Sequence, residues 1–569
     1  MLTATFKSHL KRTLQSDVYV GIYRWLHHIR KLHQPLATQS DYLKTFIDVF
    51  GISRSKNPTA RSEILMLSLV NTGLFAKFDG LLAKAFALKG FNPTVICSRD
   101  QKTARYIRLF GVKNIVYWDD LVAKYAAPEN ELEAAVKNLV PRKLTPQEIK
   151  EMFFHEVAVG RHALSWTLRR LFLGHPDLNN PQVWDLFVEQ LKVDVQAVLV
   201  MENWLREYSP AILIMRDPGY VPNGAIYETS LRHGVDTIEY AIGQKTGTFV
   251  FKRYSLEERW TRYLSISRIT WEKIRDEPWT PEKDQALQTE FEGRYHPDSK
   301  LDIRFIQTGK KLKSTDEVIQ QLGLDPNKKT AVVFSHVAFD AAFFSGQDLF
   351  EDLEDWFIQT AQAACQNPNL NWILKLHPGN LAKVGFAKGF EEPELIKLRL
   401  IDPLPDHVKI LRANTDINTR SLHPLIDYGL TVRGTIGFEL PCLGIPTVIA
   451  GTGYYSGYGF TIDAQTREGY LNILARLDTI PPLNDEQILL AKKHAYCLFV
   501  ERQTPVDNVL EFKFTPVRTH HFLSQNVRLK VRSAKELMTL PSMDGLLHWV
   551  TESTSPDLIV RPSEDTKIQ

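Results

Sequence analysis

The chain has few cysteines, no long apolar run and almost no net charge. Its four cysteines in 569 residues show no metal-ligand spacing, so we expect free thiols and a reducing compartment. No apolar run approaches the ~20 residues that a membrane-spanning helix needs. The 69 basic residues nearly balance the 66 acidic ones, which excludes a chain-wide footprint for nucleic acid. No apolar core with a small-residue cleavage site marks a secretory signal, so a cytoplasmic location is expected.

The composition is globular, with 44% apolar and 24% charged residues, and the length allows two or three domains. Buried β-branched runs alternate with helical stretches, which predicts an α/β fold with parallel sheets and crossover helices. Residues 128–208 and 253–295 are expected to be largely helical. The expected parts are a helical arm (1–60), a first α/β domain with a helical insertion (61–300), a second α/β domain (325–490) and a C-terminal helical extension with a frayed tail (491–569).

The N-terminal arm is basic and amphipathic. Residues 1–33 hold six lysines and arginines against the single acid Asp17, and apolar side chains recur along one helical stripe. Such a helix is suited to contact with the surface of a membrane, here its inner face. The alternative is a helix that packs on the next domain and leaves its basic face in solvent.

A glycine turn follows a predicted strand within residues 431–470. The chain passes through Gly434, Thr435 and Gly437 into a short helix that carries Glu439. Free backbone N–H groups in such a turn favour an anion. Glu439 lies four residues after Thr435, so the two share a helix face, one suited to phosphate and one to a ribose hydroxyl. Ordinary α/β packing is the alternative explanation.

Two other strand ends in the second domain carry titratable side chains. One strand is followed by His336 and Asp340, and the strand at 371–376 carries Lys375 near its end and His377 at its tip. Strand side chains alternate, so Lys375 and His377 are expected on one face. A cation beside an imidazole suits a phosphate or diphosphate.

In the first domain, a strand at 211–215 runs directly into a polar loop. Ligands bind outside the carboxyl ends of strands in open parallel sheets, so this loop is a candidate site. Asp217 or Glu228 could act as a base, and Arg216 could bind an anion. The alternative is turn formation, because Asp-Pro-Gly and Pro-Asn-Gly form turns on their own.

Three motifs, in this order, resemble those of the capsule polysaccharide biosynthesis glycosyltransferases, the Kdo-transferase-like group. The motifs are Lys375-Leu376-His377-Pro378, Arg433-Gly434-Thr435-Ile436-Gly437-Phe438-Glu439 and Gly444-Ile445-Pro446, and Tyr454-Tyr455 and Gly459-Phe460-Thr461-Ile462-Asp463 are also similar to that group. The resemblance covers roughly residues 60–490 and is strongest in 330–470. It implies the GT-B fold, in which two Rossmann-like domains face each other across a cleft.

The resemblance also implies how the two domains share the substrates. His377 and the turn at Thr435 would hold the donor phosphate, and Glu439 would hold hydroxyls of the ribose or sugar. The first domain would hold the acceptor through Arg216 and Asn223. The full expected donor-binding set is His336, Lys375, His377, Arg433, Gly434, Thr435, Gly437 and Glu439.

The resemblance does not identify the catalytic base. The acidic pair followed by glycine that bacterial sialyltransferases use as a base is not evident in this sequence. Asp217, Glu228 and Asp340 therefore remain rival candidates for that role.

The function expected from these observations is transfer of a sugar from a nucleotide-sugar donor to a surface or capsular polysaccharide, free or lipid-linked. A CMP-linked donor of the Kdo type is one candidate. Neither a cofactor beyond the donor nor a metal ion is expected, because no paired-Asp motif for a divalent cation is visible. Two alternatives remain, a non-hydrolysing nucleotide-sugar epimerase and a catalytically inactive scaffold of glycan assembly.

Overall fold

The computed structural model describes most of the two α/β domains and the segments that join them. The described residues are 63–69, 73–99, 101–296, 307, 309–340, 343–379, 398–401, 403–511 and 528–561. The predicted helical arm, with its proposed membrane contact, and the end of the predicted frayed tail lie outside these residues.

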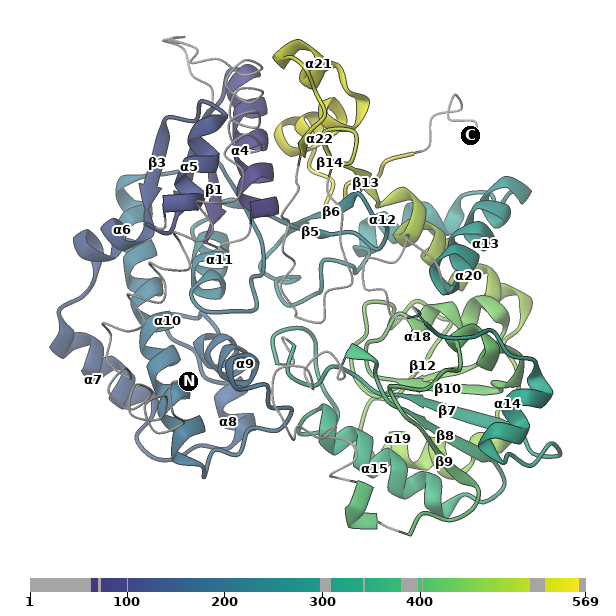
Figure 1. Cartoon of the computed structure of the whole chain (residues 1–569). Helices are drawn as coiled ribbons and strands as arrows, with labels where there is room; N and C mark the ends of the chain where they lie inside the picture. The colour runs from purple at the N-terminus through teal and green to yellow at the C-terminus, as the bar shows by residue number, and fades with distance from the viewer. Residues whose placement is uncertain are drawn as a thin grey trace, which may run out of the picture.

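The first domain is built on a seven-stranded sheet in the order β13-β6-β5-β4-β1-β2-β3 (Figure 1). Its parallel strands are β1 (Glu63–Ser68), β2 (Asn92–Cys97), β3 (Asn114–Tyr117), β4 (Ile212–Met215) and β5 (Asp236–Ile242). The crossover helices include α4 (Gly73–Leu88), α5 (Gln101–Leu109) and α11 (Asn223–Arg232). In β1, Ile64 and Met66 pack on the α4 side, whereas Leu65 and Leu67 pack on the opposite face. Both faces of the sheet are covered, which explains the continuous apolar runs of these strands.

A helical insertion between β3 and β4 forms the outer part of the first domain. Its helices are α6 (Trp118–Tyr125), α7 (Glu129–Leu139), α8 (Pro146–Lys150), α9 (Val159–Leu171) and α10 (Pro181–Glu207). The long helix α10 begins where the Asn180 side chain accepts a hydrogen bond from the Gln182 N–H, with Pro181 in the first turn. Apolar side chains of α9 and α10 pack together, so α9 is held beside the sheet's carboxyl edge.

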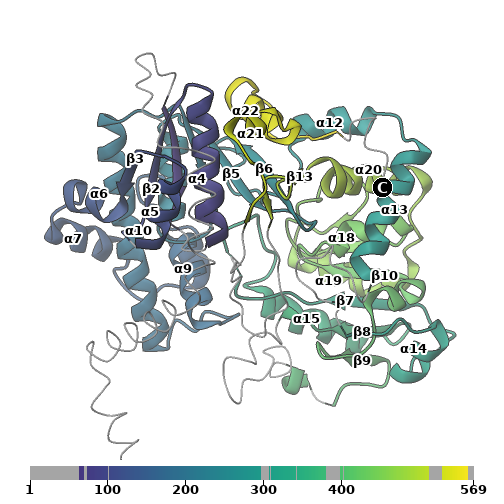
Figure 2. The ribbon, with the colours of Figure 1, turned by 45° about the horizontal axis from the view of Figure 1, so that its top comes forward.

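The second domain has a six-stranded parallel sheet in the order β12-β11-β10-β7-β8-β9. Its strands are β7 (Thr330–Phe334), β8 (Asn371–Lys375), β9 (Val408–Leu411), β10 (Tyr428–Thr431), β11 (Thr447–Ile449) and β12 (Ile462–Asp463). Helices α15 (Leu353–Gln366) and α19 (Arg467–Ala475) cover one face. The other face is covered by α14 (Thr315–Leu322), the 3-10 segment η2 (Thr419–Leu425) and α18 (Ile436–Glu439) (Figure 2). Two Rossmann-like α/β domains are therefore present, and the predicted fold class is confirmed.

The chain returns to the first domain after the second one. Helix α20 (Asp485–Tyr496) continues into a π-helical turn (Cys497–Glu501), and β13 (Thr504–Pro505) then pairs with β6 (Thr248–Tyr254). Helices α21 (Ala534–Thr539) and α22 (Pro541–Glu552) pack in the same apolar cluster as α4. The predicted extension, 491–569, thus contributes a strand and two helices to the first domain.

The segment between β5 and the second domain is less helical than expected. Strand β6, antiparallel to β5, ends only at Tyr254, and a loop over 255–267 precedes α12 (Arg268–Asp276) and α13 (Pro281–Tyr295). The expectation that 253–295 is largely helical agrees with α12 and α13, whereas the first part of this range is the end of β6 and a loop. The run Thr248-Phe249-Val250-Phe251 of β-branched and aromatic residues was the available signal for the strand.

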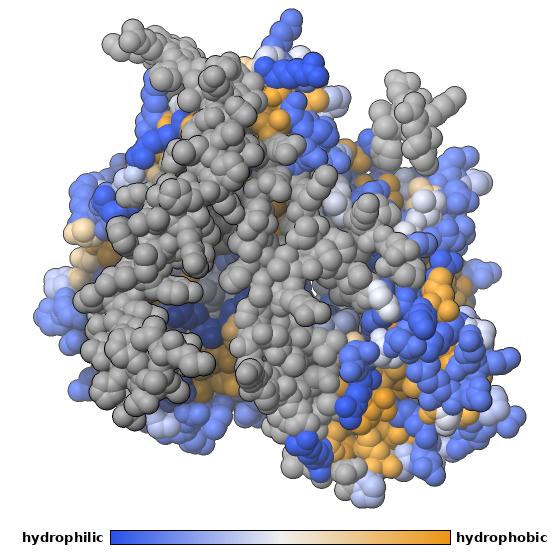
Figure 3. Space-filling model, in the orientation of Figure 1, coloured by the Kyte–Doolittle hydropathy of each residue, from blue (hydrophilic) through white to orange (hydrophobic). Residues whose placement is uncertain are grey.

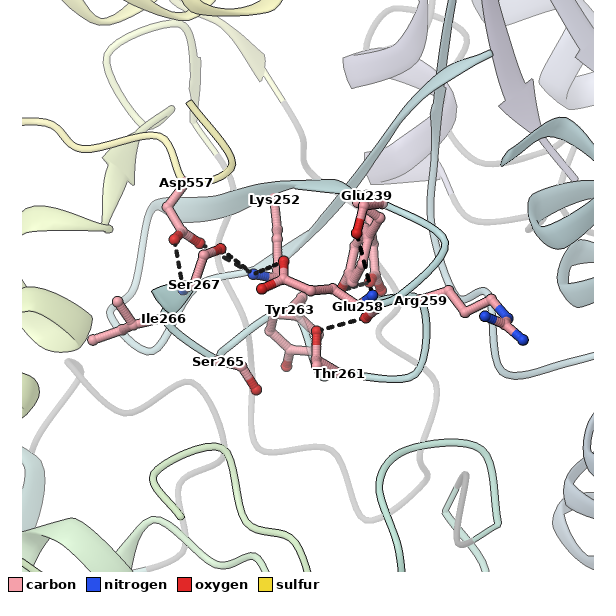
Figure 4. A network of polar contacts seen from close by, with 12 residues as sticks. Glu239, Lys252, Glu258, Arg259, Thr261, Tyr263, Ser265, Ile266, Ser267 and Asp557 are labelled. Carbon is pink, nitrogen blue, oxygen red and sulfur yellow. Dashed lines mark hydrogen bonds and ion pairs between the residues drawn. The ribbon is translucent and has the colours of Figure 1, made fainter. Parts of the chain in front are cut away.

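A buried ion network ties the returning chain to this loop (Figure 4). The Lys252 ammonium lies 2.7 Å from the Ser267 hydroxyl and 3.5 Å from the Asp557 carboxylate, and Arg502 lies 3.0 Å from the same carboxylate. All three ionic side chains are almost fully buried. Burial raises the pKa of Asp557, but the charges of Arg502 and Lys252 outweigh it and lower that pKa to about 2.

The same network fixes the loop's backbone. Arg502 donates to the carbonyl oxygens of Tyr263 at 2.8 Å and of Leu264 and Ser265 at 3.0 Å each. The Ser267 N–H donates to the Asp557 carboxylate at 2.8 Å. Residues 263–267 are therefore held by two segments that are distant in the sequence.

In the view of Figure 3, hydrophilic residues cover most of the visible described surface. Among the described residues, no helix has the length and apolar character needed to cross a membrane.

Replacement of Asp557 by Asn tests this network. We expect Asp557→Asn to lower the free energy of unfolding by about 3–5 kcal/mol, because it leaves Arg502 buried without its carboxylate and Lys252 with only Glu258, 3.8 Å away. Because the pKa of Asp557 is lowered, its carboxylate contributes stability that is present above about pH 3.8, the ordinary pKa of an aspartate. This stability is lost as the pH falls toward 2. Urea unfolding from pH 7 to pH 2 measures both effects. Asp276→Asn, at an exposed ion pair, is the control, and equal unfolding curves for the two variants would contradict the account.

Candidate active site

The glycine turn after β10 is braced from two sides. On one side, Nε2 of the half-buried His336 accepts a hydrogen bond from the Val432 N–H at 3.0 Å and lies 3.1 Å from the Thr431 hydroxyl. On the other side, the Tyr455 hydroxyl donates to the Gly434 carbonyl at 2.9 Å. The turn is therefore a preformed structure with a fixed backbone.

His336 serves the turn as a neutral ring. Its low-dielectric surroundings, and then the charges of Arg433, His377 and Arg262, lower its pKa well below 6.5. A neutral imidazole can accept at Nε2, which the hydrogen bond from Val432 requires. His336, predicted to bind the donor, thus lies directly under the turn and positions it.

Gly437 is needed because Tyr455 passes so close to it. A Cβ at position 437 would lie 2.1 Å from the Tyr455 ring. At Gly434 a Cβ would meet the Thr431 hydroxyl at 3.0 Å, a tight but less severe contact. The second glycine of the turn is therefore the one that the packing demands.

Two backbone N–H groups of the turn are available as donors within the described part of the chain. Within the part of the chain that the structure describes, the N–H groups of Thr435 and Ile436 donate to no protein acceptor. Thr435 is partly exposed and precedes the four-residue helix α18. Two adjacent backbone N–H groups of this kind can bind an oxyanion.

Lys375 and His377 lie at the end of β8, one strand beyond β7 in the same sheet. Burial, and then the charge of Lys310, lower the pKa of Lys375 to about 7. The His377 Nδ1 accepts the Gly379 N–H at 3.0 Å, so the neutral ring carries its proton on Nε2. Lys310 was not predicted, and its position in a lysine-rich stretch resembled an ordinary solvated boundary.

Glu439 is almost fully buried at the boundary with α13. Its carboxylate accepts a hydrogen bond from the Tyr295 hydroxyl and lies 3.6 Å from the Arg294 guanidinium. The Tyr295 ring is in turn 5.0 Å from the His423 ring. The sequence did not indicate these partners, because they are over a hundred residues from Glu439 and form no motif with it.

The loop after β4 contains the predicted residues of the first domain. Arg216 is buried with its guanidinium 3.2 Å from the centre of the Phe75 ring, and the Asn223 side chain donates to the Arg216 carbonyl at 2.9 Å. Both residues, predicted to bind the acceptor, thus shape the loop from inside. Asp217 is exposed and has a φ of 53°, a left-handed conformation that is uncommon outside glycine.

Glu228 belongs to a fully buried cluster. It lies 3.1 Å from Nε2 of His162, whose Nδ1 lies 2.8 Å from Asp194, and it accepts from the Trp260 indole at 3.2 Å. Burial lowers the pKa of His162, but the two carboxylates outweigh it and raise that pKa to about 9. Glu228, predicted as a possible base, is enclosed on all sides by protein. His162 and Asp194 were not predicted, since they come from two different helices of the insertion.

Asp340, the third candidate base, joins the two domains. Its carboxylate is bound by Arg169 of α9 and accepts the Tyr220 hydroxyl at 2.8 Å. Half of its side-chain surface stays exposed. The loops that follow β4 and β7 therefore meet, with the carboxyl edges of both sheets turned toward each other.

A second bridge lies beside Asp340. Arg161 of α9 donates to the carbonyls of Phe343 and Gly346 at 3.4 Å, and Arg433 of the glycine turn donates to the Ser345 carbonyl at 2.8 Å. The Gly346 N–H donates to the Trp260 carbonyl at 3.0 Å. The segment 343–346 thus links the first domain to the glycine turn.

Neither the cysteines nor the side chains that could bind a metal add a further candidate site in the described part of the chain. All four cysteines are unpaired, as predicted. Among the described residues, no group of three or more His, Cys, Asp or Glu side chains is arranged to hold a metal ion.

No protein-family model and no curated protein matches the chain. Solved structures show distant similarity. The β-Kdo 2,4-transferase KpsC of Thermosulfurimonas dismutans is 16% identical over 50% of this chain and 80% of that chain, with a TM-score of 0.32. The UDP-GlcNAc 2-epimerase of Neisseria meningitidis is 11% identical over 76% of this chain and 95% of that chain, with a TM-score of 0.25. The spinosyn rhamnosyltransferase SpnG is 11% identical over 77% of this chain and 95% of that chain, with a TM-score of 0.24.

Substitution of Gly437 tests the braced turn. We expect Gly437→Ala to cost about 1–3 kcal/mol of stability, because its methyl group overlaps the Tyr455 ring. Gly545→Ala is a control, since nothing lies within 4 Å of a Cβ there. Chemical unfolding of both variants makes the comparison. A Gly437→Ala protein as stable as the wild type would show that the turn is not tightly packed.

The His162 cluster predicts a pH dependence of stability. A folded-state pKa of about 9, raised from 6.5, gives stability that is complete below pH 6.5 and lost as pH rises through 9. The difference in melting temperature between wild type and His162→Gln should therefore shrink from pH 6 to pH 10. His233→Gln, at an exposed position, should show no such trend. A constant difference for His162→Gln over this range would rule out a charged His162.

Proposed function

We propose that the protein is a glycosyltransferase that moves a sugar from a nucleotide-sugar donor to a glycan acceptor. The observation that supports it most is the braced glycine turn at the carboxyl edge of a parallel sheet. Its Thr435 and Ile436 N–H groups donate to no acceptor among the described residues. Lys375 and His377 stand at the end of a strand in the same sheet. This combination is suited to the phosphate of a nucleotide.

In the proposed reaction, the second domain binds the donor and stabilises the leaving nucleotide. The turn's N–H groups, the Lys375 ammonium and the Nε2–H of His377 would donate to phosphate oxygens. A phosphate beside Lys375 favours its charged form, which opposes the effect of burial on its pKa. These donors would balance the charge that develops on the departing phosphate. The scheme uses protein donors in the place of a metal ion and needs no cofactor beyond the donor.

Of the three carboxylates, Asp217 is best placed to act as the base. It is exposed at the carboxyl end of β4, whereas Glu228 is enclosed and Asp340 is already bound by Arg169 and Tyr220. In this scheme Asp217 accepts the proton of the acceptor hydroxyl while the oxygen of that hydroxyl forms a bond to the anomeric carbon of the sugar. The bond from that carbon to the phosphate oxygen breaks, and the nucleotide leaves with the electron pair.

The finer assignment is also a proposal. It comprises a CMP-linked donor of the Kdo type as the first candidate, a surface or capsular glycan as the acceptor, and a place at the inner face of the membrane. The motifs around Lys375, Arg433 and Gly444 support the first two points through their resemblance to capsule glycosyltransferases. The basic residues of 1–33 support the third.

Binding and transfer assays test the function. A nucleotide that binds the folded protein raises its melting temperature, and we expect one class of nucleotides to do so for wild type but not for His377→Ala. His548→Ala, an exposed site, is the matched control. In Asp217→Asn, the nucleotide should still raise the melting temperature, but the rate of sugar transfer should fall by about 10²–10⁴-fold. Asp120→Asn, exposed and ion-paired like Asp217, should transfer at the wild-type rate.

Each alternative has a distinct outcome. Conversion of the nucleotide sugar into its epimer, without an acceptor, would identify an epimerase. A folded protein that no nucleotide stabilises would indicate a scaffold. Full transfer by Asp217→Asn would move the role of base to Asp340.

A further inference from the structure

The loop over 255–267 belongs to the first domain but reaches the second one. Its Trp260 carbonyl accepts the Gly346 N–H at 3.0 Å, and the Tyr227 hydroxyl donates to its Arg259 carbonyl at 3.0 Å. Arg502 donates to the three carbonyls that follow Arg262. Arg262 therefore stands on a backbone that is fixed on both sides, next to the domain boundary.

The Arg262 side chain differs from the other arginines of this region. Arg259 lies 3.4 Å from Glu228, and Arg268 lies 3.3 Å from Glu272. Over the residues that the structure describes, no carboxylate lies within ion-pair distance of Arg262, and its guanidinium donates to no protein oxygen. The side chain is only half-exposed. A partly buried guanidinium without an acceptor is unusual, because charged groups in such surroundings are normally paired.

The loop that carries Arg262 contacts the segment beside the glycine turn of the other domain. Trp260, two residues before it, is bonded to Gly346, and the neighbouring Ser345 carbonyl is bonded to Arg433. Arg161 reaches the same segment through the Gly346 carbonyl. Arg161 of α9 and Arg433 of the turn thus meet at this segment, next to the loop that carries Arg262.

The charge balance of this cluster favours an anion. Arg433 is paired with Asp348. Within the described residues, the hydrogen bonds of Arg161 go to carbonyl oxygens, and its guanidinium lies over the Trp260 ring. Burial, and then the Arg262 charge, lower the pKa of Arg433 to about 9. The Arg262 charge also contributes to the lowered pKa of His336 beneath the turn. A bound oxyanion would relieve this repulsion.

We propose that Arg262 binds the phosphate that the glycine turn of the other domain holds. This inference rests on the proposed function and names a residue that the sequence did not indicate. A guanidinium has five N–H donors in a planar fork and can bind two phosphate oxygens at once. The phosphate is thus held between the Thr435 and Ile436 N–H groups of the second domain and Arg262 of the first.

The arrangement has a consequence for the reaction. Negative charge increases on the phosphate as the bond to the sugar breaks, so a positive charge fixed beside it stabilises the transition state. Arg262 supplies that charge only while the two domains are together. Donor binding and the juxtaposition of the domains are therefore coupled.

Calorimetric titration of variants tests the role of Arg262. The probes are UDP, CMP and inorganic pyrophosphate, with uridine and cytidine as controls that lack phosphate. We expect Arg262→Gln to weaken binding of the phosphate-bearing probes by about tenfold or more and to leave binding of the nucleosides unchanged. Arg262→Lys keeps the positive charge but not the planar fork of donors, so its affinity for the phosphate-bearing probes should lie between those of the wild type and Arg262→Gln. Arg268→Gln, on the neighbouring helix with an 88% exposed side chain, should behave like the wild type. Thermal unfolding verifies that each variant is folded.

The outcomes separate this inference from the proposed function. Wild-type affinity of Arg262→Gln for every phosphate-bearing probe would overturn the role of Arg262, and so would an equal loss of nucleoside binding. Binding of pyrophosphate that depends on Arg262, with no binding of either nucleotide, would support the anion site and remove the nucleotide-sugar proposal. No binding of any probe to the folded wild type would overturn both.

Discussion

The buried contacts among Lys252, Arg502 and Asp557 are the constraint on which the two-domain arrangement depends. These residues come from β6, from the segment after α20 and from the C-terminal part of the chain. The desolvation of three ionic groups is costly, so the network is stable only when all three segments are in place. It closes the chain onto the first domain after the second domain is complete. It also fixes the loop that carries Trp260 and Arg262 to the domain boundary.

The proposed donor site combines a rigid turn with charges from both domains. Neutral His336 and the Tyr455 hydroxyl fix the turn's backbone, and Lys375 and His377 lie at the end of β8, two strands away in the same sheet. Arg161, Arg262 and Arg433 gather where the domains meet. A preorganised group of donors loses little free energy on reorganisation when a charged ligand binds, which is the physical basis for expecting phosphate chemistry here.

The sequence predicted the parts of the fold that depend on local patterns. Continuous apolar runs and glycine turns located most strands of both sheets, and the turn at Gly434–Gly437 lies where it was predicted. Strand β6 was missed because its apolar run, Phe249-Val250-Phe251, is short and is followed directly by charged residues. The partners of Glu439 and Glu228 were also missed, because Tyr295, His162 and Asp194 come from distant helices. Contacts of this kind depend on tertiary packing, which no spacing in a single sequence records.

Hydrogen exchange with and without a nucleotide is the measurement that tests the central claim most directly. The claim is that one phosphate is bound by both domains, at the glycine turn and at the anchored loop. The account predicts that UDP or CMP slows amide exchange in peptides covering 432–440 and, at the same nucleotide concentration, in peptides covering 257–263. Slower exchange in neither region, or only at surfaces distant from both, would contradict it.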